Sequence, residues 1–355
     1  MSKERNSNIE TLRIVSMLLI VLHHLCKYAY AGGASIEVDT VRNLLLLGGK
    51  VGVDAFVLIT GYFLASGRIK LASLLRVLLE AWLYSLVLGL GCAFFAPDAF
   101  SAKDFLKSFL PTSGGLPWFV TAYLGLYLVA PWLARFSSGL SKAQFFSLLT
   151  VGFCVFSLVP TLTACMFVTS DFSWFCYLFL IACFIRRFGI SAVFARRIFV
   201  GGGAFLIGSV VVGEIICIGY PEYSGNITYF ANMYTVPTLL VSVGLFRIFE
   251  GLKMPSLRVI NIIAQGTFGV YLIHENTFAR KLIWQNFEFV FTGNVAMEII
   301  YALLVAAAVF TALTCIDLAR LYLLEKPLFH MFQVKFNHRF KQCDIELNAV
   351  SEKEA

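Results

Sequence analysis

Long apolar stretches recur along the whole of this 355-residue chain. A run of about 18 or more apolar residues crosses a hydrocarbon core of about 30 Å as an α-helix. Hydrophobic residues make up 59% of the sequence and charged residues only 14%, whereas a soluble domain is roughly 45 to 50% apolar. A β-barrel would need short segments of alternating polarity in place of continuous apolar runs. The sequence therefore predicts an all-α protein that crosses a membrane many times.

Hydropathy, with Gly, Pro and charged clusters taken as breaks, predicts a polytopic bundle of about ten transmembrane helices. They are expected near residues 11–30, 44–65, 73–96, 117–134, 144–164, 172–186, 198–219, 230–249, 259–279 and 295–322. The first run is too long for the apolar core of a cleaved signal peptide, so we expect it to be retained. Residues 1–335 are predicted to form one transmembrane domain, and residues 336–355 a short polar cytoplasmic tail.

Positive charges divide unequally between the two sides of the membrane that these ten helices define. Twenty Lys and Arg residues fall on the side of the N-terminus and seven on the other, with Arg13 at the start of the first helix. Because Lys and Arg concentrate in cytoplasmic segments, both termini are predicted to be cytoplasmic. The topology also accounts for the net charge of +7.

Composition disfavours two classes of function. Nucleic-acid binding would need a basic, solvent-facing domain, and the sequence contains no such segment, so no nucleic-acid partner is expected. The nine cysteines lie mostly within apolar runs and form no CxxC pair. We interpret them as core residues, and no metal ion is expected.

The first predicted helix carries two ionisable residues on one face. Arg13 and His24 are eleven residues apart, a spacing that returns to within about 20° of the same direction and separates them by roughly 16 Å. Arg13 suits an anion because its guanidinium is always charged and bidentate, and His24 suits a general base because its pKa lies near neutrality. The alternative is structural: Arg13 reaches the headgroups and pairs with Glu10, while His24 is hydrogen-bonded in the core.

Asp54 lies inside the apolar second span, in the segment GVDAFVLITGYFL. A buried carboxylate needs a partner, and one role is to orient an imidazole, as in catalytic triads. The alternative is a carboxylate stabilised by the helix dipole and by Lys50. Arg68 and Lys70 follow the same helix on the cytoplasmic side. Topology alone accounts for positive charge there, and phosphate binding is a second interpretation.

Several short motifs occur in a fixed order along the chain. They are Arg13, ten intervening residues and His24; Gly52-Val53-Asp54 with Phe56; Thr60-Gly61-Tyr62-Phe63; Leu116-Pro117-Trp118-Phe119-Val120 with Tyr123, Tyr127 and Pro131; Thr267–His274; and Glu325-Lys326-Pro327. This ordered set resembles the acyltransferase-3 family of integral membrane acyltransferases over residues 10 to about 330. Two departures are mild: Ala55-Phe56 stands for Phe-Phe, and Thr60-Gly61-Tyr62 for Ser-Gly-Phe.

The resemblance implies a ten-helix bundle that takes an acyl group, usually acetyl, from cytoplasmic acyl-CoA. The acceptor is a hydroxyl, commonly on the far side of the membrane. The family's essential His corresponds to His24, and its Arg, associated with acyl-CoA use, to Arg13. Stand-alone members without an extra soluble domain often modify cell-surface or exported glycans, and the expected location is the bacterial cytoplasmic (inner) membrane.

Other polar and aromatic residues in these motifs are candidates for the acceptor site. His274 and Glu275 lie towards the outer end of the ninth span with Tyr271, and a structural polar pair is the alternative. Trp118 is equally well an interfacial anchor. Glu325, where the last helix leaves the bilayer, is expected to pair with a cytoplasmic Arg and hold the acyl-CoA entrance, or to form an interfacial salt bridge with no catalytic role.

The resulting hypothesis is a membrane-embedded O-acyltransferase, in its simplest form an acetyl-CoA-dependent O-acetyltransferase acting on a glycan. The donor acyl-CoA is expected near Arg13, Arg68 and Lys70. His24, oriented by Asp54, would deprotonate the acceptor hydroxyl, and a covalent acyl-histidine relay is left open. Expected partners are acyl-CoA, the hydroxyl acceptor and the lipid bilayer, and a homo-oligomer is left open.

Two rival interpretations belong to other classes of protein. One is a transporter or flippase for a lipid-linked sugar or related solute, with Arg13, Asp54 and His274 lining its pathway. The paired half-segments of an inverted repeat are not evident in the sequence, which counts against it. The other is a bundle that only organises a glycan-assembly complex. Consumption of acyl-CoA distinguishes an acyltransferase from both.

Overall fold

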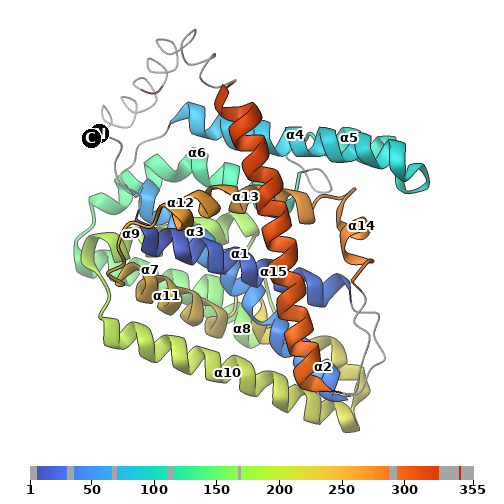
Figure 1. The fold of residues 1–355 in the computed structure, drawn as a ribbon. Helices are drawn as coiled ribbons and strands as arrows, with labels where there is room; N and C mark the ends of the chain where they lie inside the picture. Colours follow the sequence, from blue (N-terminus) through green and yellow to red (C-terminus); the bar gives the residue numbers. More distant parts are fainter. Residues whose placement is uncertain are drawn as a thin grey trace.

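All regular structure in the described part of the protein is helical. The computed structural model describes residues 6–29, 36–65, 70–110, 116–166, 169–287, 294–327 and 344. Within these ranges the chain forms α-, 3-10 and π-helical segments and no strand. The predicted all-α class is therefore confirmed. Most of the long helices run side by side, and α15 crosses obliquely in front of them (Figure 1).

Eight helices in the described residues are long and apolar enough to cross a membrane. They are α1 (Ser7–Tyr28), α2 with α3 (Ile36–Leu46, Gly48–Leu64), α4 (Leu71–Phe95), α6 (Trp118–Ser138), α7 with α8 (Lys142–Phe153, Val159–Thr163), α10 (Ala192–Gly219), Pro221–Glu250 with α11 (Val236–Glu250), and α15 (Val295–Arg320) with its π-helical end Leu321–Glu325. These match eight of the ten predicted spans.

The other two predicted spans are also helical: one is an uninterrupted helix with charged residues at both ends, and the other is broken in two. Span 172–186 is α9 (Asp171–Phe188), whose 18 residues carry charges at both ends and whose buried face packs against α3 and α6. Span 259–279 is broken into α12 (Arg258–Ile263) and α13 (Thr267–His274) by a 3-10 turn at Ala264–Gly266. Such a break is tolerated at membrane depth where protein surrounds it, and most residues of α13 are buried.

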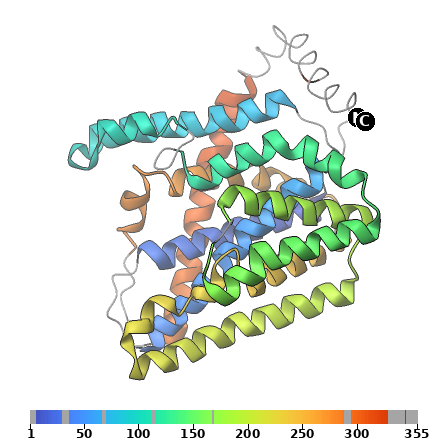
Figure 2. The ribbon, with the colours of Figure 1, turned by 180° about the vertical axis from the view of Figure 1, so that it is seen from behind.

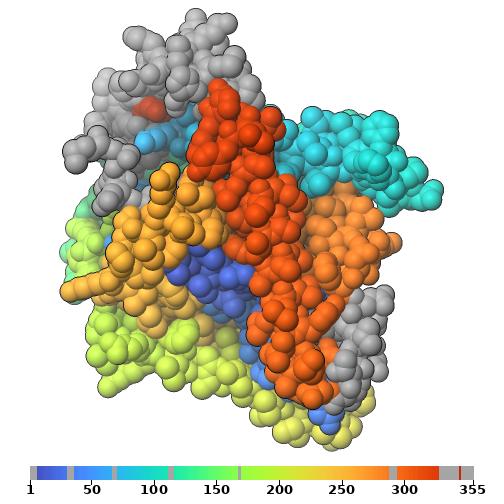
Figure 3. All heavy atoms as spheres, in the orientation of Figure 1, coloured from blue at the N-terminus to red at the C-terminus, as the bar shows by residue number. Residues whose placement is uncertain are grey.

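The central helix of the bundle is α1, which contacts α2, α3, α11, α12, α13 and α15. Only a part of it is visible beside α15 in the space-filling view (Figure 3). From behind, α6, α9 and α7 lie one beneath another and α10 forms the lower edge (Figure 2). Many apolar side chains of α10 are exposed, among them Val200, Ile207, Val211 and Ile215, as expected of a helix surface that faces lipid.

Two glycines allow α3 to lie directly against α1. A Cβ at Gly52 would lie 2.5 Å from the backbone oxygen of Ser16, and a Cβ at Gly49 would collide with the ring of His23. Small residues at helix contacts in membranes let backbones approach closely. The Gly-Gly-Lys-Val-Gly segment at the start of α3 thus determines the spacing between the two helices that carry the predicted catalytic residues.

The predicted polar tail, residues 336–355, lies outside the described residues except for Asp344. The carboxylate of Asp344 accepts a hydrogen bond from the backbone nitrogen of Leu71 at 2.8 Å. This contact lies at the N-terminal end of α4.

Candidate active site

Arg13, near the start of α1, combines an ion pair with unused hydrogen-bonding capacity. Its guanidinium lies 3.7 Å from Glu10, one turn earlier, and 5.9 Å from the ring centroid of Phe56 on α3. The pairing with Glu10 that we considered as a structural alternative is therefore present. However, Nε of Arg13 has no hydrogen-bond partner among the described residues, and 24% of the side chain is exposed. Donors remain for an anionic group.

The imidazole of His24 is hydrogen-bonded to a second histidine. Nδ1 of His24 lies 2.9 Å from Nε2 of His274, and Nδ1 of His274 lies 2.6 Å from the carbonyl oxygen of Val270. A carbonyl only accepts, so Nδ1 of His274 donates, and in a neutral ring Nε2 of His274 must then accept. His24 therefore donates from Nδ1. The hydrogen positions are assigned from these hydrogen bonds. They leave Nε2 of His24 without a hydrogen, so that it can act as a base.

Two further side chains lie against His24. A carboxylate oxygen of Glu275 is 3.6 Å from its Nε2, where a negative charge stabilises the imidazolium that forms when Nε2 takes a proton. Tyr28, one turn further along α1, stacks on the imidazole with ring centroids 5.5 Å apart. The side chain of His24 is 12% exposed and His274 is fully buried. The base is held in one orientation, largely away from water.

Asp54 lies elsewhere in the bundle. This fully buried residue accepts a hydrogen bond at 2.9 Å from the indole nitrogen of Trp174 on α9, and its other carboxylate oxygen has no hydrogen-bond partner within the part of the chain that the structure describes. The expected contact between Asp54 and His24 is absent from the described structure, where His274 takes the orienting position. A buried carboxylate requires a hydrogen-bond donor. The indole of Trp174 supplies one and thereby links α9 to α3.

A continuous series of ring contacts leads from Tyr127, in the middle of α6, to the histidine pair. The hydroxyl of Tyr127 donates to the backbone oxygen of Lys70 at 3.3 Å. From there, successive ring centroids 5.1 to 6.4 Å apart join Tyr127, Tyr123, Phe119, Tyr271, His274 and His24. We call these six side chains the aromatic wall. Tyr271, a predicted site residue, is one of them, and the backbone of Lys70, another predicted site residue, contacts the wall at Tyr127. Phe119 also contacts the ring of Phe56, whose centroid lies 5.9 Å from the guanidinium of Arg13. Arg68 lies outside the described residues.

Trp118, the first residue of α6, holds a cation from α3. The ammonium of Lys50 lies 4.9 Å from the centroid of the indole ring, an arrangement in which the ring attracts the charge. The indole also packs against Phe119 and Phe175. Trp118, at the N-terminal end of α6, therefore also packs against Phe119 of the aromatic wall.

Glu325 belongs to a buried cluster of ion pairs between α4 and α15. Arg320 contacts Glu80 at 2.9 Å and Asp317 at 2.7 Å, and it also pairs with Glu325, which in turn contacts Arg76 at 2.8 Å. The expected pairing of Glu325 with a cytoplasmic Arg is present. The remainder of this cluster was not predicted, although Asp317 and Arg320 stand one turn apart in a long apolar helix, which is a signal for a buried pair.

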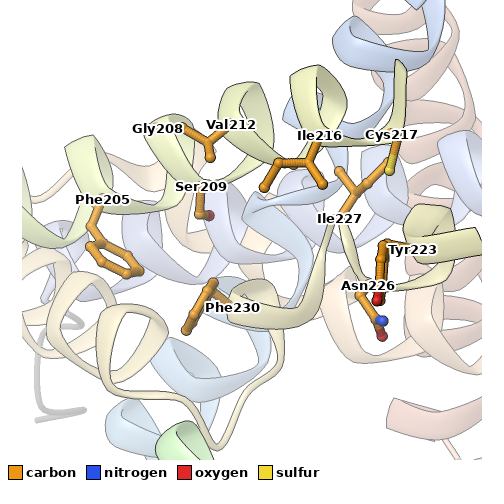
Figure 4. Close-up of a pocket in the computed structure, with 11 residues that line it drawn as sticks. Phe205, Gly208, Ser209, Val212, Ile216, Cys217, Tyr223, Asn226, Ile227 and Phe230 are labelled. Atoms are coloured by element: carbon orange, nitrogen blue, oxygen red, sulfur yellow. The ribbon is translucent and has the colours of Figure 1, made fainter. Parts of the chain in front are cut away.

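A cavity of about 690 Å³ lies between α10 and the segment 221–230 (Figure 4). Side chains of α10, among them Phe205 and Ile216, face Tyr223 and Phe230 across it. The histidine pair and Arg13 do not line this cavity. Its mostly apolar wall suits a hydrocarbon chain, and none of the predicted site residues that the structure describes lines it. Within the described residues no group of three or more His, Cys, Asp or Glu side chains is placed to hold a metal ion.

Comparison with known protein families matches residues 6–319 to an acyltransferase domain of the acyltransferase-3 type. No curated protein and no solved structure matches the chain. The matched range contains Arg13 on α1, the His24–His274 pair and Glu275. It covers far more than half of the 355 residues. The chain therefore belongs to the acyltransferase-3 family and is a membrane acyltransferase.

Proposed function

We propose that this protein is a membrane-embedded O-acetyltransferase of the bacterial cytoplasmic membrane. It takes an acetyl group from cytoplasmic acetyl-CoA and passes it to a hydroxyl of a cell-surface or exported glycan. The observation that carries the proposal is the hydrogen-bond chain from Val270 through His274 to His24, which leaves a bare imidazole nitrogen beside Glu275. That nitrogen is the general base that acyl transfer to a hydroxyl requires.

The donor enters from the cytoplasmic end of α1. Arg13 binds a phosphate of coenzyme A, and Arg68 and Lys70 are the other basic residues that we propose for donor binding. The pantetheine arm follows the aromatic wall towards His24, because the rise of about 1.5 Å per residue puts Arg13 and His24 roughly 16 Å apart, which is comparable to an extended phosphopantetheine. The carbonyl of the thioester then lies near Nε2 of His24.

During acetyl transfer, His24 carries one proton from the acceptor hydroxyl to the leaving thiolate. Nε2 takes the proton of the acceptor hydroxyl as that oxygen attacks the thioester carbonyl. The imidazolium is stabilised by Glu275, and His274 keeps the ring in place. When the carbon–sulfur bond breaks, the thiolate of coenzyme A takes the proton from Nε2. The products are the acetyl ester and free coenzyme A, and the base is regenerated.

Replacement of His24 tests the proposal directly. His24→Gln, in purified protein reconstituted in lipid, should abolish thiol release from acetyl-CoA in the presence of the cell-envelope glycan fraction. Cells that carry the variant should lose O-acetyl groups from surface glycan, as measured by mass spectrometry. The matched control is His23→Gln, because the neighbouring histidine hydrogen-bonds the backbone oxygen of Leu46 at 2.9 Å and packs edge-on against His24, so that its loss tests the packing around the base without removing the base. Thiol release by a well-folded His24→Gln protein at the wild-type rate would refute the assignment.

A further inference from the structure

Lys50 is an intramembrane cation with no carboxylate partner among the described residues. It lies in the third residue position of α3, is half-buried, and directs its ammonium at Trp118 rather than at an acidic side chain. None of the ion pairs within 4.0 Å in the described structure includes it. An ionisable residue at such a depth is expensive, and in membrane proteins it commonly marks a substrate pathway.

Two more cations lie on the outer side of the same site. Lys27 and Arg280 both approach the ring of Tyr28, with distances to its centroid of 5.2 and 5.0 Å. Tyr28 is the residue that stacks on His24. Arg280 lies 4.0 Å from Glu275. Positive charge from three separate helical segments therefore converges around the outer face of the base.

The carboxylates near Lys50 have other partners. Asp54, Asp171 and Glu275 are its acidic electrostatic neighbours. Asp54 accepts from Trp174, and Asp171 accepts a hydrogen bond from the hydroxyl of Tyr234. Glu275 lies between His24 and Arg280. No carboxylate in the described structure is therefore dedicated to the Lys50 ammonium, which remains available to an anion from outside the chain.

We propose that Lys50, with Lys27 and Arg280, binds an anionic group of the acceptor, so that the acceptor is a hydroxyl compound that also bears a phosphate or carboxylate. The inference rests on the proposed function, because the anion would hold the hydroxyl against Nε2 of His24. The phosphates of acyl-CoA are not this anion. They belong at the opposite end of α1, beside Arg13 and about 16 Å away along the helix.

The test compares simple glucose derivatives that carry or lack an anionic group. Purified protein in phosphatidylcholine nanodiscs is given acetyl-CoA with methyl glucoside, methyl glucuronide or glucose 1-phosphate, and thiol release and the acetylated product are measured. Wild-type protein should use the two anionic acceptors with kcat/KM about tenfold or more above that of the neutral one, as expected for a charge-assisted contact. Lys50→Gln should reduce this preference to about twofold or less.

Matched variants separate charge from structure. Lys50→Arg should retain the preference because it keeps a cation at the same position. Lys107→Gln, which removes an outer-side lysine on α5 (Ala102–Lys107), should leave all three rates unchanged. If Lys50→Gln lowers the rates with neutral and anionic acceptors equally, Lys50 acts on the reacting carbonyl or on folding, and the inference is wrong.

Two further outcomes identify where a failure lies. Equal use of neutral and anionic acceptors by the wild type overturns this inference alone, whereas no thiol release from acetyl-CoA with any acceptor overturns the proposed function itself. A second set of nanodiscs containing phosphatidylglycerol tests whether the cations serve lipid headgroups. If activity rises with phosphatidylglycerol and Lys50→Gln removes only that rise, the anion is a headgroup and the acceptor assignment is refuted.

Discussion

The role of His274 can be isolated by two substitutions that each preserve a different half of its hydrogen bonding. In His274→Asn the side-chain amide can still donate to the oxygen of Val270, as Nδ1 does now, but it is too short to reach His24. In His274→Gln the amide oxygen reaches the position of Nε2 and can still accept from His24. The first variant removes the orienting acceptor, and the second keeps it.

The expected loss follows from leaving Nδ1–H of His24 buried without an acceptor. Such a group costs about 1 to 3 kcal/mol, which is about a 5- to 150-fold loss of rate if the cost falls on the reactive tautomer. The other tautomer places its hydrogen on Nε2, 3.6 Å from the carboxylate of Glu275. That carboxylate would stabilise the tautomer, which has no lone pair at Nε2. We therefore expect the loss in His274→Asn to lie at the upper end of this range.

The assay is thiol release at saturating acetyl-CoA with the cell-envelope glycan fraction as acceptor. His274→Asn should lower kcat by the stated factor and leave KM for acetyl-CoA near the wild-type value, because Arg13 is untouched. His274→Gln should stay within a few-fold of wild type. Equal activity of the two variants, at equal thermal unfolding midpoints, would show that the acceptor at Nε2 is irrelevant and would refute the tautomer argument.

Three other substitutions test separate parts of the structure. Arg13→Ala should raise KM for acetyl-CoA more than it lowers kcat, with Arg13→Lys intermediate; an unchanged KM in steady-state kinetics would count against coenzyme A binding there. Arg320→Leu leaves three buried carboxylates with one fewer cation and should destabilise the protein by about 3 to 5 kcal/mol, seen as a lower unfolding midpoint in detergent. Trp174→Phe deprives Asp54 of its donor and should cost about 1 to 3 kcal/mol, and an unchanged midpoint would mean that another donor replaces the indole.

The sequence predicts the parts of this structure that depend on periodicity and hydropathy. Eight spans coincide with long apolar helices. Arg13 and His24 both lie on α1, as expected from the first predicted span. The break at Ala264–Gly266 was not predicted, because a short 3-10 turn between two apolar segments changes neither the hydropathy nor the charge pattern.

Periodicity and hydropathy do not predict contacts between residues that are distant in sequence. His24 and His274 are 250 residues apart, and Asp54 and Trp174 are 120 apart. A carboxylate beside an imidazole was the expected arrangement, since catalytic triads use it. At Nδ1 of His24 the structure instead places the imidazole of His274, whose Nε2 accepts because its Nδ1 donates to the carbonyl of Val270, and the carboxylate of Glu275 lies on the Nε2 side of His24. The pairing of His24 with His274 becomes evident only from the packing of α1 against α13.

The ion-pair cluster around Arg320 and the histidine pair both contact α13, and this explains how so short a helix holds the base in place. Asp317 packs directly against Gly269, where a Cβ would collide with its carboxylate. Tyr84 donates a hydrogen bond to the same carboxylate at 2.6 Å, so α4 and α15 together fix the first half of α13. One turn later the helix ends with His274, which orients His24. Because α13 is only eight residues long, the ion-pair cluster that positions its start also sets the position of the imidazole at its end. A side chain at residue 269 would collide with the carboxylate of Asp317, and we expect that collision to displace the end of α13 that carries His274.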